Sequence, residues 1–402
     1  MKHRFNVSEN VIFIVLLCLV FTFGLYTLVK NPVATSQSEN RNLAQFQHFT
    51  IKSFLDGSFQ SSFENALSDQ FPKSEKIRTL YGESMNKLPK YGIDAIACAN
   101  RYIFLDGKQN TNTVFDCDDY ILPPPMTEDP KQKQFLASDL LDEDIKKYNH
   151  INSIADTYYY FIEEAQSFNF ETGERVLDLE STLRNRLKGS YSMASLQFSN
   201  YDEFKRYYYK TDHHWNQVGQ YQGYQDIVRL LGAGEPATPS GLITNHEEYF
   251  GSRAKDARNY DFPEEFSYYK FDLPQRDTFI NRKLQEYGHQ DTYSDHSYKS
   301  SRLFNHYAYV FGSDYGEIVF DYNQPDKDNL LIISNSFDNP IDSWIAQHFN
   351  KTYAVDPRHY KDHIGEKFVL SKYIEENNIN KVLLIIQPRF IYNASSNQGL
   401  EL

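Results

Sequence analysis

The densest group of residues able to do chemistry is Thr211-Asp212-His213-His214-Trp215, where a carboxylate lies two positions before an imidazole. The preceding Tyr207-Tyr208-Tyr209 is typical of an extended segment, in which residues two apart project to the same side. We therefore expect Asp212 and His214 to point together and His213 to point away. A carboxylate beside a histidine fixes its tautomer and stabilises its charged form, as a general base serving a serine nucleophile requires.

Other interpretations of this group stay open. Adjacent histidines before a helix can cap that helix, or they can form a metal pair. An Asp-His-His sequence is also typical of metal-dependent phosphoesterases, but the further Asp-rich motifs of those enzymes are not found in this sequence. We favour catalysis over a structural role, and a structural role over a metal site.

Ser336 is the candidate nucleophile because it closely follows the apolar run 330–333. A serine in this position is more often a helix cap. However, a strand–turn–helix arrangement would expose the hydroxyl at the sheet edge and aim helix N–H groups at a developing oxyanion. The segment Ser334-Asn335-Ser336-Phe337 has the small, turn-prone residues of a tight elbow. The backbone amides of Ser336 and Phe337 are the candidate oxyanion donors.

The elements that would position these residues are clearest in the C-terminal third. We expect strands at 330–333, 352–355 and 382–386, and helices at 341–349 and 362–377. Asn339-Pro340 suits the start of the first helix, with Asn as cap and Pro in the first turn. Continuously apolar strands alternating with helices predict a mainly parallel sheet covered on both faces, an α/β/α sandwich. Ligands gather beyond the carboxyl ends of such strands, which here carry Ser336, Asp356, Arg358, Gln387 and Arg389.

The rest of the chain gives weaker signals. We expect a helix that contains Phe54 to Leu67 and stops near Phe71-Pro72, because proline disfavours helix at the preceding residue. Further expectations are a helix at 73–88, strands within 93–105, a loop at 110–132, a helix at 137–154, a strand at 157–162 and a helix at 216–231.

Residues 11–29 are nineteen consecutive residues without a charge, enough for a helix of about 28 Å, roughly the thickness of a bilayer core. Lys2 and Arg4 place the short N-terminal side in the cytoplasm. A cleaved signal peptide is the alternative, but its apolar core is usually shorter. We expect a cytoplasmic tail at 1–10, a signal anchor at 11–29, a stalk at 30–50 and an extracytoplasmic domain at 51–402.

Composition excludes several classes of protein. The 402 residues carry 41 Lys+Arg against 54 Asp+Glu, and this net charge of −13 argues against a nucleic-acid partner. Hydrophobic residues at 40% and charged residues at 24% exclude wholesale disorder. Three cysteines without zinc-type spacing indicate neither structural zinc nor a disulfide-stapled fold. The sequence contains 31 Tyr and 30 Phe, and aromatic side chains can form flat platforms that bind sugar rings. The interpretation we favour is that most of these residues belong to a strand-rich core.

Residues 207–219, Tyr-Tyr-Tyr-Lys-Thr-Asp-His-His-Trp-Asn-Gln-Val-Gly, closely resemble the signature of the DHHW protein family. Further matching pieces follow the expected order: Glu39-Asn40-Arg41, Phe63-Glu64, Asp69-Gln70-Phe71-Pro72 and Asp356-Pro357-Arg358-His359-Tyr360. The family in turn resembles the SGNH-hydrolase-like domain of alginate O-acetyltransferases. The resemblance implies an SGNH-like fold, with Asp212 and His214 as the Asp-x-His pair and Ser336 as nucleophile. Ser334-Asn335 stands where Gly-Asp is usual.

The resemblance implies extracytoplasmic transfer of an acyl group, such as acetyl, to a cell-envelope polysaccharide through a Ser-His-Asp triad. Arg358, Tyr360 and Gln387 are weaker candidates for binding substrate, and neither a metal nor an organic cofactor is required. A transferase of this kind implies a membrane-bound O-acyltransferase partner. Two alternatives remain: a carbohydrate O-acetyl esterase with the same triad, and a catalytically silent glycan-binding or assembly module.

Overall fold

The structure is a computed structural model, and it describes residues 7–36, 41–73, 76–77, 80, 114–115, 120–123, 140–170, 172–257, 259–285, 303–392 and 400–401. The chain divides into two compact units, each considered by itself: Met1–Ala95 with Lys255–Tyr260, and Ile96–Ala254 with Asp261–Leu402. Apart from a few isolated residues, the helix expected at 73–88, the strands within 93–105 and the loop at 110–132 lie outside the described residues.

The smaller unit contains the following elements: α1 (Val7–Val29), β1 (Thr35–Ser36), β2 (Arg41–Asn42), α2 (Ile51–Leu55) and α3 (Ser58–Gln70). Within the part of the chain that the structure describes, no helix has both the length and the apolar character needed to cross a membrane. The helix expected around Phe54 is two helices, because Gly57 between them adopts a left-handed φ of 80°. Its predicted end is confirmed, since Phe71 is the C-cap of α3.

Gln70, at the end of α3, joins the helix to the segment that follows α1. Its side-chain oxygen accepts a 2.9 Å hydrogen bond from Val33 N, and its nitrogen donates to Val33 O at 2.9 Å and Ala44 O at 3.1 Å. Asp69 accepts from Ala44 N at 2.9 Å. The Asp69-Gln70 pair therefore satisfies backbone groups of Val33 and Ala44, which flank the β1–β2 pairing.

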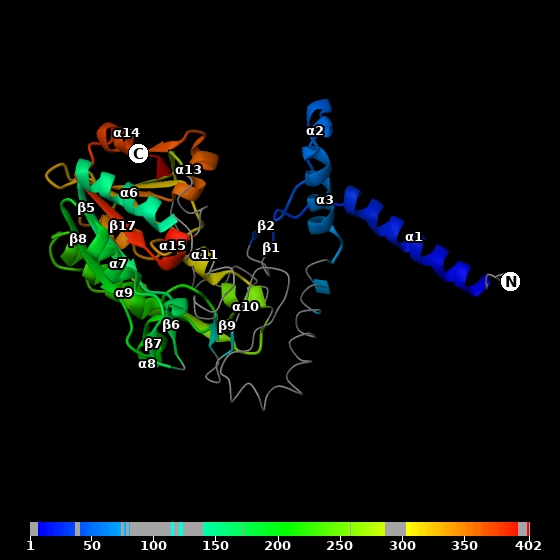
Figure 1. Ribbon diagram of the computed structural model, residues 1–402, viewed down its shortest axis with the longest axis horizontal. Helices are drawn as coiled ribbons and strands as arrows, with labels where there is room; N and C mark the ends of the chain where they lie inside the picture. The colour runs from blue at the N-terminus through cyan, green and yellow to red at the C-terminus, as the bar shows by residue number, and fades with distance from the viewer. Residues whose placement is uncertain are drawn as a thin grey trace. The chain divides into compact units, whose positions relative to one another are not determined.

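The larger unit is organised by an eight-stranded sheet with the order β12-β11-β13-β15-β14-β17-β5-β8. Its strands are β5 (Asp156–Ile162), β8 (Tyr191–Leu196), β11 (Asp277–Ile280), β12 (Lys283–Leu284), β13 (Glu317–Asp321), β14 (Leu330–Ile333), β15 (Lys351–Val355) and β17 (Lys381–Ile386). The five strands from β15 to β8 run parallel, and β13, β11 and β12 extend the sheet with antiparallel pairings. Figure 1 shows β5, β8 and β17 side by side. The prediction of a mainly parallel sheet is confirmed.

Helices cover both faces of this sheet. Along β14, Leu330 and Ile332 join one buried cluster, and Leu331 and Ile333 join another on the opposite face. The first cluster receives side chains from α8 (Tyr201–Tyr207), α9 (Gln217–Leu230) and α12 (Asp342–Ala346). The second receives them from α6 (Leu140–Ile154), α7 (Leu179–Arg186), α13 (Pro357–Ile364), α14 (Leu370–Glu376) and α15 (Pro388–Tyr392). Burial on both faces explains why these strands are continuously apolar.

Two expected helices begin or end elsewhere. Helix α12 starts at Asp342 with Ile341 as N-cap, because a preceding turn already joins Ile341 N to Asp338 O at 2.7 Å. The helix expected at 362–377 is interrupted, since Gly365 ends α13 with a φ of 88°. The chain then forms β16 (Phe368–Val369), paired with β18 (Leu400–Glu401), before α14 begins.

A third buried cluster lies outside the sheet. The hairpin of β9 (Gly241–Tyr249) and β10 (Glu264–Lys270) packs with α11 (His306–Phe311), burying Tyr209, Tyr249, Phe266, Tyr268 and Tyr307. Short elements complete the described part: β3 (Val114–Phe115), β4 (Ile121–Leu122), a 3₁₀ turn (Ala165–Ser167), β6 (Phe168–Asn169), β7 (Glu174–Arg175) and α10 (Ser252–Ala257). This third cluster supplies aromatic side chains that reach the candidate site.

Candidate active site

The Asp-His-His segment is a closed loop between two helices. Helix α8 ends at Tyr207, so the extended approach predicted for Tyr207–Tyr209 is wrong in its first residue. Tyr208 and Trp215 form an isolated antiparallel bridge that closes the loop, and Asn216 caps α9 by accepting from Val218 N at 2.9 Å. Gly219 is required here, because a Cβ would lie 2.6 Å from Tyr207 O.

The loop brings the predicted base to the predicted nucleophile. His214 Nδ1 lies 2.6 Å from Asp212 Oδ1, and His214 Nε2 lies 2.9 Å from Ser336 Oγ. Asp212 and His214 are buried, whereas Ser336 is half-buried in the turn after β14. With Nδ1 donating to the carboxylate, Nε2 is the ring atom left to accept the proton of the serine hydroxyl.

Asp212 is held as a carboxylate by several donors. Its Oδ2 accepts from the Tyr249 hydroxyl at 2.9 Å and from Ser252 N at 2.7 Å, and its Oδ1 accepts from His214 N at 3.0 Å. Burial alone would raise the pKa of Asp212, but the charge of His214 and hydrogen bonds from His213 and His214 outweigh it. The pKa of Asp212 therefore lies well below its usual range.

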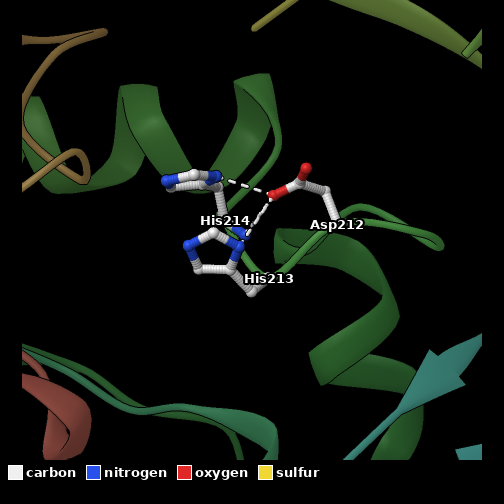
Figure 2. A group of neighbouring side chains, drawn as sticks. All are labelled: Asp212, His213 and His214. Atoms are coloured by element: carbon white, nitrogen blue, oxygen red, sulfur yellow. Dashed lines mark hydrogen bonds and ion pairs between the residues drawn. The ribbon is translucent and has the colours of Figure 1, made fainter. Parts of the chain in front are cut away.

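His213 does not point away from the pair, as the extended geometry predicted. Figure 2 shows both histidine rings directed at the same oxygen of Asp212, with His213 Nδ1 at 3.3 Å. The centroids of the two histidine rings are 3.8 Å apart, and His213 Nδ1 also lies 2.5 Å from Ser252 Oγ. The alternation rule fails because residues 210–214 turn instead of extending.

Asp212, His213 and His214 also place three ligand-type atoms within 4.8 Å of one another. A tetrahedral ion bound at about 2.0–2.2 Å separates its ligand atoms by roughly 3 Å or more. The 2.6 Å between Asp212 Oδ1 and His214 Nδ1 is shorter than this and is the distance of a charge-assisted hydrogen bond. The geometry therefore fits a carboxylate–imidazole pair better than a metal centre.

The turn around Ser336 is fixed by its neighbours. Ser334 is buried, its Oγ contacts Ile385 O at 3.4 Å, and its φ is negative, so this position does not demand glycine. Phe337 N donates to Asn335 Oδ1 at 3.2 Å, so this candidate oxyanion donor already has a partner. Within the described residues the N–H of Ser336 makes no hydrogen bond, so this second candidate oxyanion donor has no partner there.

The three weaker candidates lie in different places. Gln387 is fully buried and contacts Asn335, directly behind Ser336. Arg358 instead donates hydrogen bonds from its guanidinium group to both carboxylate oxygens of Asp356, with N···O distances of 2.5–3.0 Å. Tyr360 packs in the second core cluster, because α13 turns its apolar side to that face of the sheet. Its hydroxyl accepts a 3.1 Å hydrogen bond from Arg282 beside a separate cavity of about 560 Å³. Among the described contacts, Arg358 and Tyr360 make none with the Ser-His-Asp group.

Sequence reasoning missed several residues of the site. Glu264, on β10, accepts from Thr211 N at 2.8 Å, from Thr211 Oγ1 at 2.6 Å and from Lys210 N at 2.9 Å. Burial raises the pKa of Glu264 to about 7. Tyr249 comes from β9, Ser252 from the start of α10 and Tyr307 from α11, all far along the chain from Asp212. No spacing or motif in one sequence brings such distant residues together.

The fold and site define an α/β protein with a hydrogen-bonded Ser-His-Asp group. No family model and no curated protein matches this chain. Among solved structures, a DHHW family protein from Eubacterium siraeum DSM 15702 matches with a TM-score of 0.52 and 16% identity, covering 74% of this chain and 99% of that one. Bacillus cereus PatB1 with a sulfonyl adduct matches with a TM-score of 0.54 and 19% identity, covering 72% and 99%.

A looser match is the O-acetyltransferase domain of Pseudomonas putida AlgJ, with a TM-score of 0.36, 11% identity and coverage of 70% of this chain and 92% of that one. The expected resemblance to the DHHW family is confirmed at the level of the fold.

Proposed function

We propose that this protein is an SGNH-like enzyme that transfers an acyl group, acetyl in the first instance, to a cell-envelope polysaccharide. The observation that carries the proposal is the hydrogen-bonded series from Asp212 through His214 to Ser336 Oγ. Asp212 and His214 come from one loop and Ser336 from another, 122 residues away from His214. Their convergence on one series supports a joint catalytic role.

The chemistry follows from the atoms in this series. Ser336 Oγ attacks the acyl carbonyl as its proton passes to His214 Nε2, and the Ser336 N–H faces the developing oxyanion. When the tetrahedral intermediate collapses, His214 returns the proton to the leaving group and the acyl group remains on Ser336. An acceptor hydroxyl then attacks the acyl carbonyl as its proton passes to His214, and His214 returns that proton to Ser336 Oγ as the acyl group leaves on the acceptor. Asp212 holds the imidazole throughout.

The compartment is part of the proposal. The uncharged run 11–29, preceded by Lys2 and Arg4, supports an anchor with the remaining chain outside the cytoplasm. An enzyme there has no direct access to cytosolic acyl donors. A membrane-bound O-acyltransferase partner would supply the acyl group, and the polysaccharide would be the acceptor.

Acetyl release from an aryl acetate, with and without added oligosaccharide, tests the proposal. We expect release that depends on Ser336 and acetyl groups that appear on the oligosaccharide. Release to water alone, whatever acceptor is added, would replace the transferase by a carbohydrate esterase. No release by folded protein would favour a silent glycan-binding or assembly module. Protease added to intact protoplasts should degrade residues 40–402, and protection of this segment would contradict the extracytoplasmic location.

A further inference from the structure

Tyr307, on helix α11, contacts both the base and the nucleophile of the site. Its ring stacks on His214 with a centroid distance of 4.0 Å and an interplanar angle of 12°. Its hydroxyl donates a 2.8 Å hydrogen bond to the backbone oxygen of Ser336. The side chain is only 4% exposed. One aromatic residue thus holds two groups whose separation decides whether a proton can pass between them.

We propose that Tyr307 is a positioning residue that sets the Ser336–His214 geometry for acyl transfer. The inference rests on the proposed function for its chemical consequence. The structural part of the inference is that Tyr307 fixes both the peptide after Ser336 and the plane of the His214 ring. This part can be measured without any enzymatic turnover.

The peptide that joins Ser336 to Phe337 is held at both of its ends. In a trans peptide the carbonyl and the following N–H point in opposite directions. Tyr307 holds the oxygen end of this plane, and Asn335 Oδ1 holds the nitrogen end at 3.2 Å. Because both ends are fixed, the peptide cannot rotate without losing a hydrogen bond. Two side chains therefore restrain the backbone from which Ser336 Oγ projects toward His214.

The imidazole ring of His214 is held by a similar combination of contacts. Asp212 and Ser336 hold the ring at its two nitrogens, but these contacts leave the ring plane free to turn about the line that joins them. Tyr307 limits this turning because its ring covers one face nearly parallel, whereas His213 and Phe337 meet the ring at angles of 38° and 51°. Burial keeps the pKa of Tyr307 well above its usual range, so the phenol stays neutral. The face of a neutral aromatic ring favours the charged imidazolium that forms during proton transfer.

A purely structural role makes a different prediction. Tyr307 also packs against Phe311 at 5.0 Å in the third buried cluster, so its loss must affect stability to some degree. Tyr307→Phe keeps the ring and this packing but removes the bond to Ser336 O. Tyr307→Leu removes both the bond and the stacking on His214. Tyr309→Phe is the matched control, because Tyr309 lies on the same helix and its ring contacts Phe304.

The experiment labels the full chain with an aryl sulfonyl fluoride and separates the inactivation rate constant from the reversible binding constant. The rate constant should fall about three- to tenfold in Tyr307→Phe, as expected for loss of one hydrogen bond. It should fall about 100-fold in Tyr307→Leu, where the reacting groups lose their alignment. The binding constant should change less than twofold, and Tyr309→Phe should match the wild type.

Hydrogen exchange at the Phe337 amide gives the second readout, and it requires no reactivity. The amide should exchange several-fold faster in Tyr307→Phe than in the wild type or in Tyr309→Phe, at equal global stability. An unchanged amide would overturn the proposal whether or not the protein is labelled. Equal inactivation rate constants in the wild type and Tyr307→Leu would overturn it as well. If the wild type is never labelled, this result contradicts the proposed function and not the role of Tyr307. The exchange rate of the Phe337 amide then tests the role of Tyr307 by itself.

Discussion

Asn335 Nδ2 donates a 2.8 Å hydrogen bond to Gln387 Oε1, which pairs two buried side-chain amides at the residue that precedes Ser336. The oxygen of the same Asn335 side chain accepts from Phe337 N. Asn335 therefore joins the end of β17 to the turn that carries the candidate nucleophile. Where a Gly-Asp-Ser-Phe-like serine block has an aspartate, this chain has an amide that makes two hydrogen bonds.

Substitutions at Asn335 test this arrangement. Asn335→Ala should lower the free energy of unfolding by about 1–3 kcal/mol, because it leaves the buried Phe337 N–H without an acceptor and Gln387 Oε1 without a donor. Asn335→Asp should lose less, since a carboxylate still accepts from Phe337 N and the Gln387 amide can turn its nitrogen toward it. Urea denaturation at pH 7 checks both, and an alanine variant as stable as the aspartate variant would contradict this account.

The adjacent histidines should respond unequally. His214→Ala should reduce acetyl release about 10⁴-fold or more, because the members of a triad act as a unit. His213→Ala should cost about tenfold, the effect of losing one hydrogen bond near the carboxylate. Initial rates on an aryl acetate measure both. Equal losses in the two variants would mean that His213 takes part in the proton transfer itself.

The absence of a side chain at Gly251 leaves the space that the Asp212 side chain occupies. A Cβ there would lie 2.3 Å from Asp212 Cβ and 2.5 Å from Asp212 Oδ2, so Gly251→Ala must displace Asp212. We expect labelling of Ser336 to slow by about 100-fold in this variant. Gly241→Ala is the control, because nothing lies within 4 Å of a Cβ at that position. Indistinguishable labelling rates in the two variants would show that the carboxylate tolerates displacement.

Glu264 predicts a pH dependence of stability. Burial raises the pKa of Glu264 to about 7 in the folded protein, above the value of an unfolded glutamate. Its contribution to stability is therefore complete below the unfolded pKa and is lost as the pH rises through about 7. The loss should be on the order of 3 kcal/mol. Glu264→Gln should flatten the decline between pH 5 and 8 in denaturation curves, and an unchanged slope would contradict the assignment.

The sequence predicted the parts of the fold that depend on local pattern. The apolar runs now seen as β14, β15 and β17 were placed within a residue or so, because strands buried on both faces need continuous apolar side chains. Asn216 and Gly232 marked the ends of α9 for the same local reason, since one caps its start and the other adopts φ 62° after its end.

Features that depend on tertiary contacts could not be predicted from local sequence pattern. The loop at 210–214 is shaped by Glu264, which accepts hydrogen bonds from Lys210 and Thr211 more than fifty residues earlier in the chain. The local pattern therefore predicts an extended segment and the wrong direction for His213. Tyr307 reaches His214 only through the packing of α11 on the hairpin. Tyr360 matched a family motif, yet the register of α13 turns it into the core.

The most direct test of the central claim is to find the residue that a sulfonyl fluoride modifies. The account predicts a single adduct on Ser336, mapped by fragmentation. The adduct should be absent in Ser336→Ala, nearly absent in His214→Ala, and slow to form in Asp212→Asn, where the imidazole tautomer is misdirected. Ser334→Gly should be labelled at least as fast as the wild type. Ser334 is buried, so its hydroxyl does not compete for the reagent, and glycine can adopt the negative φ of this position. An adduct on Ser334, or no adduct in folded protein that binds glycan, would contradict Ser336 as the nucleophile.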